Sequence, residues 1–338
     1  MDHYENRQVI LKKRPKNIPE AEDFKIIKTV LPKISTGKII IRNIFLSVEP
    51  AMKGWVSAIG NYAQPVALNS VMKSFATGIV IDSCHSDYQP GDLVTGLFGW
   101  QEYALVDAGV VDRKITTNTL PMSTSLGVAG INGITAYLGL LSVGQPVSGE
   151  TVVVSTAAGS VGSCVGQIAK IKGCTTVGIT GSQKKVDMCK NIYRYDQAID
   201  YKNDDLTSSL AKHCPQGIDI YFDNTGGTIS DKVIQKLNIG ARVVLCGTAS
   251  ISSWNPPPLG PRLERQILIK RARMEGFLIF DHKERYSEAL LALTKWVISG
   301  EINYREDILH GIEKAPSAIS AIYRGENLGK LLIKLGEE

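Results

Sequence analysis

The stretch at residues 151–173 limits the possible folds more than any other part of the chain. It opens with four consecutive β-branched residues at 151–154, which predict a strand buried on both faces. A turn of small residues follows, and apolar residues then recur at helical spacing up to Gly173. A buried strand that passes through a tight turn into a helix predicts one unit of a parallel α/β sheet.

The turn itself carries a dinucleotide-binding pattern. Ala157, Gly159 and Gly162 occupy the glycine positions of G-x-G-x-x-G, with Ala in the first. Small residues there let the backbone approach a pyrophosphate, and the N-terminus of the following helix supplies free N–H groups and a positive dipole. Because the pattern lies between a strand and a helix, as the motif requires, it favours a dinucleotide site. A turn that is merely well packed is the alternative.

The end of the next strand indicates which dinucleotide is bound. The strand expected at 175–180 runs into Gly181, and Lys184 and Lys185 follow, with no Asp or Glu at the strand end. NAD-binding proteins place a carboxylate there for the ribose hydroxyls, whereas a 2′-phosphate favours lysine. The sequence therefore predicts NADP(H) rather than NAD(H). The alternative is that the two lysines belong to an ordinary solvated helix start.

The composition suits a globular protein with two domains. The chain has 338 residues, 43% of them hydrophobic, and a net charge of +5 with Lys and Arg scattered along it. This distribution does not indicate a nucleic-acid surface, and no apolar run approaches the roughly 20 residues that span a membrane. The polar N-terminus lacks a signal-peptide core, so we expect a cytoplasmic protein with reduced cysteines.

The first third of the chain predicts an all-β, barrel-like domain. The segment at 49–73 shows no regular pattern, and a long irregular stretch in a compact domain is usually functional. It carries Met52, Trp55, Tyr62 and Met72, which could line a pocket or simply hold the segment down. The expected strands cover residues 7–11, 24–30, 38–47, 79–82, 93–98 and 103–106.

From residue 125 onward, strands and helices alternate as in a doubly wound parallel sheet. Ligands of such sheets bind at the carboxyl ends of the strands, which places Ser155, Gly181, Asn224 and Gly247 along one rim. Asn224 could instead cap a turn. Further strands are expected at 197–200, 218–222, 242–246 and 273–280, helices at 187–193, 206–214, 230–237, 286–299 and 315–323, and a helix pair at 127–141 broken by Gly133.

Two further features lie in the C-terminal third. Four prolines between 249 and 261 exclude regular structure there and predict a loop over the rim or a subunit contact. A last strand at 329–335 is expected to return to the first domain, because that domain needs a closing partner.

The order of a strand-rich domain, a dinucleotide domain and a short C-terminal return resembles the medium-chain dehydrogenases/reductases. Five stretches, nearly end to end, narrow the resemblance to the zinc-independent prostaglandin reductase and NADPH-dependent alkenal double-bond (curcumin) reductase branch. They are NRQVILKKRPKN at 6–17, LSVEPAMKGW at 46–55, YFDNTGG at 221–227, RMEGFLIFD at 273–281 and GENLGKLLIKL at 325–335. The resemblance implies a GroES-like β-barrel catalytic domain at 1–124, a Rossmann doubly wound domain that binds NADP at 125–300, and a C-terminal return at 301–338.

The sequence offers no zinc site of the alcohol dehydrogenase kind. Those enzymes use Cys and His ligands and a second four-Cys site. No four-Cys lobe is found here, and the adjacent Cys84 and His85 would point to opposite faces of a strand. Without a Lewis acid, alcohol oxidation loses its usual means of activating the hydroxyl. Reduction of a conjugated C=C needs less help, because hydride attacks the β-carbon and the carbonyl delocalises the charge as an enolate.

The resemblance also implies roles for individual residues along the cofactor, although turn or packing chemistry is the alternative for each. The phosphate turn is Gly159, Ser160, Val161 and Gly162. The 2′-phosphate end of the adenosine matches Gly181, Lys185 and Tyr201, the ribose matches Asn224, and a helix start beside the cofactor matches Thr135. The nicotinamide matches Cys246, Gly247, Thr248 and Ala249, then Phe277, Leu278 and Ile279, and finally Asn327 on the C-terminal return.

The substrate side departs from the family pattern at two positions. The family often has a pocket tyrosine where this chain has Ala51, and another near the place of Trp254. A phenol that could polarise the carbonyl or protonate the enolate is therefore missing, and Tyr62 is the best remaining catalytic candidate. Tyr62 could equally serve packing, with solvent or the ribose hydroxyl supplying the proton. Catalysis would then rest mostly on positioning.

Together these observations predict an NADPH-dependent ene-reductase that reduces the C=C of α,β-unsaturated ketones or aldehydes. Met52, Trp55 and Trp254, with Tyr62, indicate a hydrophobic pocket for a small-molecule enone or enal. NADPH-dependent quinone reduction and a non-catalytic NADPH-binding role are the alternatives. The proline-rich loop and the resemblance both indicate a homodimer.

Overall fold

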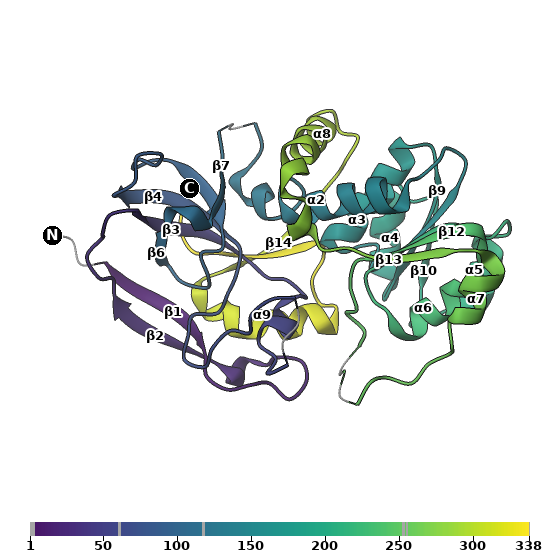
Figure 1. Cartoon of the computed structure of the whole chain (residues 1–338), viewed down its shortest axis with the longest axis horizontal. Helices are drawn as coiled ribbons and strands as arrows, with labels where there is room; N and C mark the ends of the chain where they lie inside the picture. Colours follow the sequence, from purple (N-terminus) through teal and green to yellow (C-terminus); the bar gives the residue numbers. More distant parts are fainter. Residues whose placement is uncertain (1–3, 60–61, 117–118, 252–253, 255, 338) are drawn as a thin grey trace. The chain divides into compact units, whose positions relative to one another are not determined.

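The computed structural model describes residues 4–59, 62–116, 119–251, 254 and 256–337. The chain divides into two compact units, which we call the first and the second unit. The first unit combines the N-terminal part up to Leu126 with the C-terminal part from Glu306, and the second runs from Gly127 to Arg305 (Figure 1).

A seven-stranded sheet forms the body of the first unit within the described residues. Its strands are β3 (Lys38–Ser47), β4 (Ala76–Ser83), β5 (Leu93–Gly96), β6 (Tyr103–Asp107), β7 (Val111–Lys114), β14 (Glu306–His310) and β15 (Lys330–Lys334). The long, Ile-rich β3 is mostly buried and pairs antiparallel with β4, β6 and β15. A separate hairpin joins β1 (Glu5–Leu11) to β2 (Phe24–Val30) (Figure 1).

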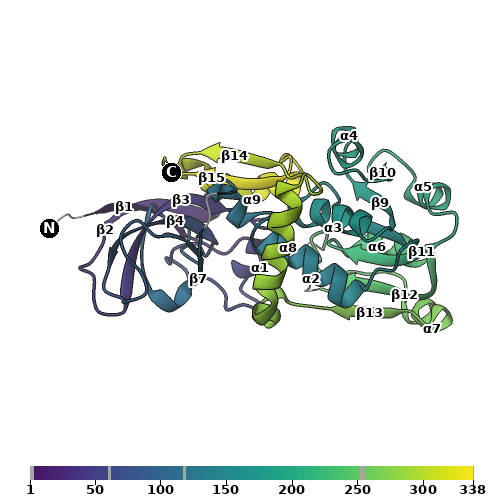
Figure 2. The ribbon, with the colours of Figure 1, turned by 90° about the horizontal axis from the view of Figure 1, so that it is seen from above.

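The C-terminal strand closes the first unit. β15 places Leu332 opposite Ser47 of β3, and β14 lies parallel to β15 (Figure 2). Helix α9 (Ala315–Arg324) connects β14 to β15, with Pro316 in its first turn and Gly325 ending it in the left-handed region. The last strand of the chain therefore pairs within the first unit.

The second unit contains a parallel sheet of six strands among its described residues. They are β8 (Thr151–Ser155), β9 (Thr175–Thr180), β10 (Gln197–Asp200), β11 (Ile218–Asp223), β12 (Leu237–Leu245) and β13 (Arg273–Gly276). The spatial order is β10-β9-β8-β11-β12-β13, which is the doubly wound order of dinucleotide-binding domains. The fold class expected from the sequence is therefore confirmed.

Helices flank this sheet. They are α2 (Ile131–Leu138), α3 (Ser160–Ile171), α4 (Gln183–Asn191), α5 (Leu206–His213), α6 (Gly227–Ile234), α7 (Glu264–Lys270) and α8 (Tyr286–Ile298). One apolar cluster unites Leu210 of α5 and Val233 of α6 with Tyr221 and Val243 of the sheet. Burial of this face fixes α5 and α6 against the strands that lead to the rim.

The helix pair expected at 127–141 is wrong. Gly133 lies inside the single helix α2, which passes directly into a π-type turn at Gly139–Gly144. A Cβ on Gly133 would lie 1.9 Å from the carbonyl oxygen of Val128. The glycine therefore permits a close approach of the backbone rather than a break in the helix.

Several other boundaries differ from the expectation. Strand β12 begins at Leu237, where a helix was expected to end, and β13 stops at Gly276 instead of running to 280. Helix α4 begins earlier than expected because Ser182 caps it by accepting from the N–H of Lys185. Four elements were not expected from the sequence, namely β7, β14 and the short helices α7 and α1 (Met52–Trp55). Because α1 lies in the segment at 49–73, that segment is not wholly irregular.

The close approach at Gly133 predicts a strong cost for Gly133→Ala. We expect the added methyl group to force α2 away from Val128 and to lower the free energy of unfolding by about 1–3 kcal/mol, measured by thermal or urea denaturation. Gly109→Ala is the control, because a Cβ there meets no heavy atom within 4 Å. Equal stability of the two variants would contradict the steric explanation.

Candidate functional site

The turn from β8 into α3 has the shape expected of a phosphate-binding loop. Thr156 adopts the left-handed region with φ of 54°, and Gly159 is the N-cap of α3. A Cβ on Gly162 would lie 2.3 Å from the carbonyl oxygen of Thr156, so the tight turn itself requires a glycine there. Gly159, Ser160 and Val161 are partly exposed, and the first N–H groups of a helix have no partner within it. They can bind an anion.

Four residues lie together near the end of β9, and three of them were expected from the sequence. The Cβ position of Gly181 is 3.1 Å from the ring of Tyr201 and 3.2 Å from the side chain of Lys202. Lys185 lies one turn into α4 and is half-buried, whereas Lys184 is exposed. Lys202 was not among the sequence candidates, although it directly follows Tyr201 in the DYK stretch.

The electrostatics of this cluster suit an anion. Burial, and then the neighbouring ammonium of Lys202, lowers the pKa of Lys185. Two cations that destabilise each other in this way are stabilised when a phosphate dianion binds between or beside them. The described residues at the end of β9 thus fit the 2′-phosphate that distinguishes NADP(H) from NAD(H).

The buried carboxylate of Asp223 organises the neighbouring rim. It accepts hydrogen bonds from the N–H groups of Thr225 and Gly226, at 2.9 Å each, and from the hydroxyl of Tyr221 at 3.0 Å. Its backbone oxygen accepts from the N–H groups of Cys246 and Gly247. The carboxylate therefore fixes the turn after β11, and its carbonyl ties the start of the segment after β12 to that turn. Asp223 was not a candidate from the sequence, although an Asp directly before the N-T-G-G stretch could have identified it.

The structure places Asn224 in a turn contact. Its side-chain amide donates to the carbonyl of Ser155 at 2.7 Å, and its backbone N–H donates to the Ser155 hydroxyl at 2.8 Å. This geometry agrees with the alternative that Asn224 stabilises the rim, and its role toward a ribose stays a prediction. Thr248 is exposed, and Ala249 donates its N–H to the carbonyl of Asn224.

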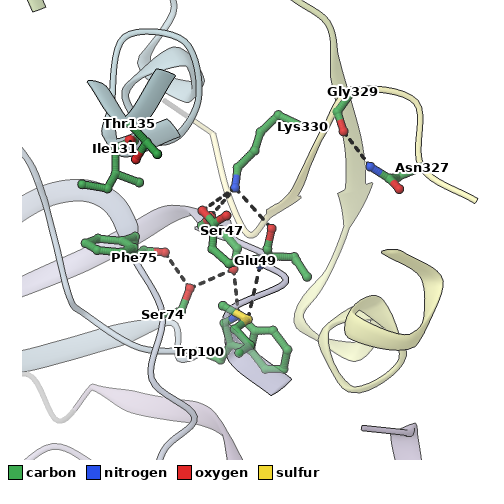
Figure 3. A network of polar contacts seen from close by, with 12 residues as sticks. Ser47, Glu49, Ser74, Phe75, Trp100, Ile131, Thr135, Asn327, Gly329 and Lys330 are labelled. Carbon is green, nitrogen blue, oxygen red and sulfur yellow. Dashed lines mark hydrogen bonds and ion pairs between the residues drawn. The ribbon is translucent and has the colours of Figure 1, made fainter. Parts of the chain in front are cut away.

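Three other cofactor candidates also have partners within the protein. The hydroxyl of Thr135 donates to the carbonyl of Ile131 at 2.6 Å, and the amide of Asn327 donates to the carbonyl of Gly329 at 2.7 Å (Figure 3). The ring of Phe277 packs over Gly139, where a Cβ would approach it to 2.5 Å. Leu278 is exposed and Ile279 is buried. Their contacts with a nicotinamide stay predictions.

The substrate candidates of the first unit differ in exposure. Met52 and Trp55, both on α1, are buried, and Trp55 packs edge-on against Phe75 with ring centroids 6.4 Å apart. The indole N–H of Trp55 is buried and finds no acceptor among the described residues, which calls for an explanation in a native structure. Tyr62 is 50% exposed, and Trp254, in the second unit, is 60% exposed.

Helix α9 brings a second tyrosine to the segment at 49–73. The hydroxyl of Tyr323 donates to the carbonyl of Pro50 at 2.9 Å, and the ammonium of Lys53 lies 5.4 Å from its ring centroid. Burial, with a further contribution from Tyr62, raises the pKa of Tyr323. The phenol therefore stays protonated at neutral pH. Nothing in the local sequence pattern pointed to Tyr323.

The expected geometry of Cys84 and His85 is wrong. Both residues follow the end of β4 rather than lying on a strand, and the ring nitrogen Nδ1 of His85 accepts from the N–H of Asp87. Among the described residues, no group of three or more His, Cys, Asp or Glu side chains is arranged to hold a metal ion. A search of the same residues finds no helix long and apolar enough to cross a membrane.

Comparison with known proteins agrees with this architecture. Residues 7–113 match the family described as the N-terminal domain of oxidoreductase, and residues 160–296 match the family described as zinc-binding dehydrogenase. The chain is 41% identical over 338 residues to a putative NADP-dependent oxidoreductase of Bacillus subtilis, with 98% of each chain covered. It is 39% identical over 337 residues to the NADPH-dependent curcumin reductase of Escherichia coli, covering 98% of this chain and 97% of that protein.

A solved structure gives the same result. The crystal structure of CurA from Vibrio vulnificus in complex with NADPH is 40% identical and superposes with a TM-score of 0.92, covering 98% of this chain and 100% of that one. These near full-length matches show that the chain belongs to the medium-chain dehydrogenase/reductase family, in the zinc-independent branch with the curcumin, alkenal and prostaglandin reductases.

Proposed function

We propose that the protein is an NADPH-dependent ene-reductase acting on the C=C of α,β-unsaturated ketones or aldehydes. The observation that carries this proposal is a cluster that suits the 2′-phosphate of NADPH and lies where β9 of the doubly wound sheet ends. It consists of Gly181, Lys185, Tyr201 and Lys202. Relatives along nearly the whole chain support the reaction, because they are named curcumin reductase and 2-alkenal reductase.

The proposed reaction adds a hydride to the β-carbon of the enone and a proton to its α-carbon. NADPH, when bound, supplies the hydride. One donor on the segment at 49–73 suits the negative charge that develops on the substrate's carbonyl oxygen, namely the phenol of Tyr62, which is accessible to solvent. Met52 and Trp55, both buried, would support this segment through apolar packing.

The central test is a paired assay on the purified protein. NADPH and NADH are each supplied with a short alkenal, an aryl enone and a quinone, and the products are identified by mass spectrometry. We expect NADPH consumption with the alkenal or the aryl enone, and a product with its C=C saturated. Turnover with the quinone alone, with radical products, would favour quinone reduction. NADPH binding without any turnover would favour a non-catalytic role.

The cofactor preference is testable by charge removal. We expect Lys185→Met and Lys202→Met each to weaken NADPH binding by about tenfold, because each removes one charge-assisted contact to the 2′-phosphate, and to leave NADH binding unchanged. Dissociation constants from fluorescence titration are the measurement. Lys184→Met is the matched control, since that side chain is exposed beside the site. An equal loss for NADPH and NADH would disprove the assigned contact.

The role of the phenol in turnover is a separate prediction. If Tyr62 donates to the carbonyl oxygen or protonates the enolate, Tyr62→Phe lowers kcat for the enone by about a hundredfold and leaves the NADPH dissociation constant unchanged. Tyr88→Phe serves as the control, because Tyr88 lies in the loop after β4, outside the segment at 49–73. Its ring contacts the ammonium of Lys114 on β7. An unchanged kcat would assign Tyr62 to packing and the proton to another donor.

The homodimer and the cytoplasmic location stay predictions from the sequence. Exposed apolar side chains on the second unit, including Leu259 and Leu268, are consistent with a subunit contact.

A further inference from the structure

A buried ammonium group ties the C-terminal strand to the start of the segment at 49–73. Lys330 lies on β15 and is almost fully buried. Its Nζ donates to the hydroxyl of Ser47 at 2.7 Å, to the carbonyl of Val48 at 3.2 Å and to a carboxylate oxygen of Glu49 at 2.5 Å (Figure 3). The three acceptors are consecutive in the chain, so one side chain fixes three successive residues.

The acceptors are held from other sides as well. The Ser47 hydroxyl donates to the same Glu49 oxygen at 2.7 Å. The carbonyl of Ser47 accepts from the indole of Trp100 at 3.1 Å and from the hydroxyl of Ser74 at 2.8 Å (Figure 3). The backbone at 47–49 therefore has a single well-defined course as it leaves β3.

Glu49 connects the fixed backbone at 47–49 directly to α1. Its carbonyl accepts the N–H of Met52 at 3.1 Å, and its own N–H lies 3.5 Å from the sulfur of Met52. The N–H of Trp55 in turn bonds to the carbonyl of Ala51 at 3.2 Å. Contacts thus run from Lys330 through Glu49 to Met52, and Trp55 follows in the same short helix.

Stability alone is a weak reason for such an ion pair. Removing two charges from water costs about as much as their attraction returns, and apolar replacements of buried pairs are often neutral or stabilising. Burial lowers the pKa of Lys330, while Glu49 and then Glu306, opposite it on β14, act in the other direction. The ammonium form therefore depends on these carboxylates, and its geometry is specific.

We propose that Lys330 and Glu49 are positioning residues that hold α1, with Met52 and Trp55, in the orientation that the enone requires. This inference rests on the proposed function and deepens it, because it assigns the geometry of the substrate segment to the C-terminal strand. Neither side chain contacts the substrate. They act through the backbone of residues 47–52.

The decisive comparison is between single and double variants. Lys330→Met removes the ammonium that pairs with the buried Glu49 carboxylate, so we expect a clear loss of thermal stability. Glu49→Gln together with Lys330→Met removes both charges, and we expect the melting temperature to return close to that of the wild type. In this double variant the KM for the enone should still be at least about tenfold higher, because the link to α1 is gone. NADPH affinity should not change.

A matched control comes from the same strand. Lys334 pairs with the exposed Glu337, and its side chain lies near Phe45 rather than near the segment at 49–73. Lys334→Met should therefore leave both the KM for the enone and the exchange described below unchanged. If Lys334→Met raises the KM as much as the double variant does, the effect belongs to β15 in general and the proposal fails.

Hydrogen exchange provides a readout that does not need the reaction. We expect amides at 52–56 to exchange faster in the double variant than in the wild type, while amides of the second unit keep their rates. If the double variant regains both stability and the wild-type KM, or if exchange at 52–56 is unchanged, the pair is structural only and the proposal is overturned. Should the double variant not fold, Ser47→Ala carries the same two measurements, because it removes the hydroxyl that contacts both Lys330 and Glu49 but keeps the two charges paired.

The two proposals fail in different ways. A wild-type protein that reduces no enone refutes the proposed function, whatever the exchange data show. A wild-type protein that reduces enones, with a double variant of unchanged KM, refutes only the positioning role of Lys330 and Glu49.

Discussion

The antiparallel pairing of β15 with β3 is the contact on which the first unit depends. It joins strands so distant in the chain that Lys330 and Ser47, which share a hydrogen bond, are 283 residues apart. Strand β3 already pairs with β4 and β6, and β15 covers the part of it that leads into the segment at 49–73. Since a buried lysine is tolerated only where acceptors surround it, Lys330 requires this pairing.

The second unit depends on a different constraint, namely the common edge where parallel strands end. At this edge the bonds of Asp223 order the turn after β11 and tie it to the segment after β12, and Gly162 permits the tight turn after β8. Lys185 and Lys202 follow β9 and β10, which are neighbours in the sheet. Residues that are remote in sequence thus converge because the strands are parallel and adjacent.

Most elements could be predicted because their signals are local. The β-branched run that forms β8 and the apolar spacing of α3 depend on residues close in the chain. The errors have non-local causes. Gly133 suggested a helix break, but its role is set by the backbone of Val128, and β14 is recognisable as a strand only through its partner β15. Short polar strands such as β7 carry too weak a pattern.

The residues of the candidate site likewise divide into those that local sequence predicts and those that only the fold brings together. The sequence by itself determined the strand–turn–helix unit, the small residues of its turn and the lysine at the end of the second strand, because these signals lie within about 35 consecutive residues. Only the tertiary structure placed Lys202 beside Lys185, Tyr323 against Pro50 and Lys330 between Ser47 and Glu49. Contacts of this kind arise from strand pairing and burial, which depend on the whole chain and leave no spacing to recognise in advance.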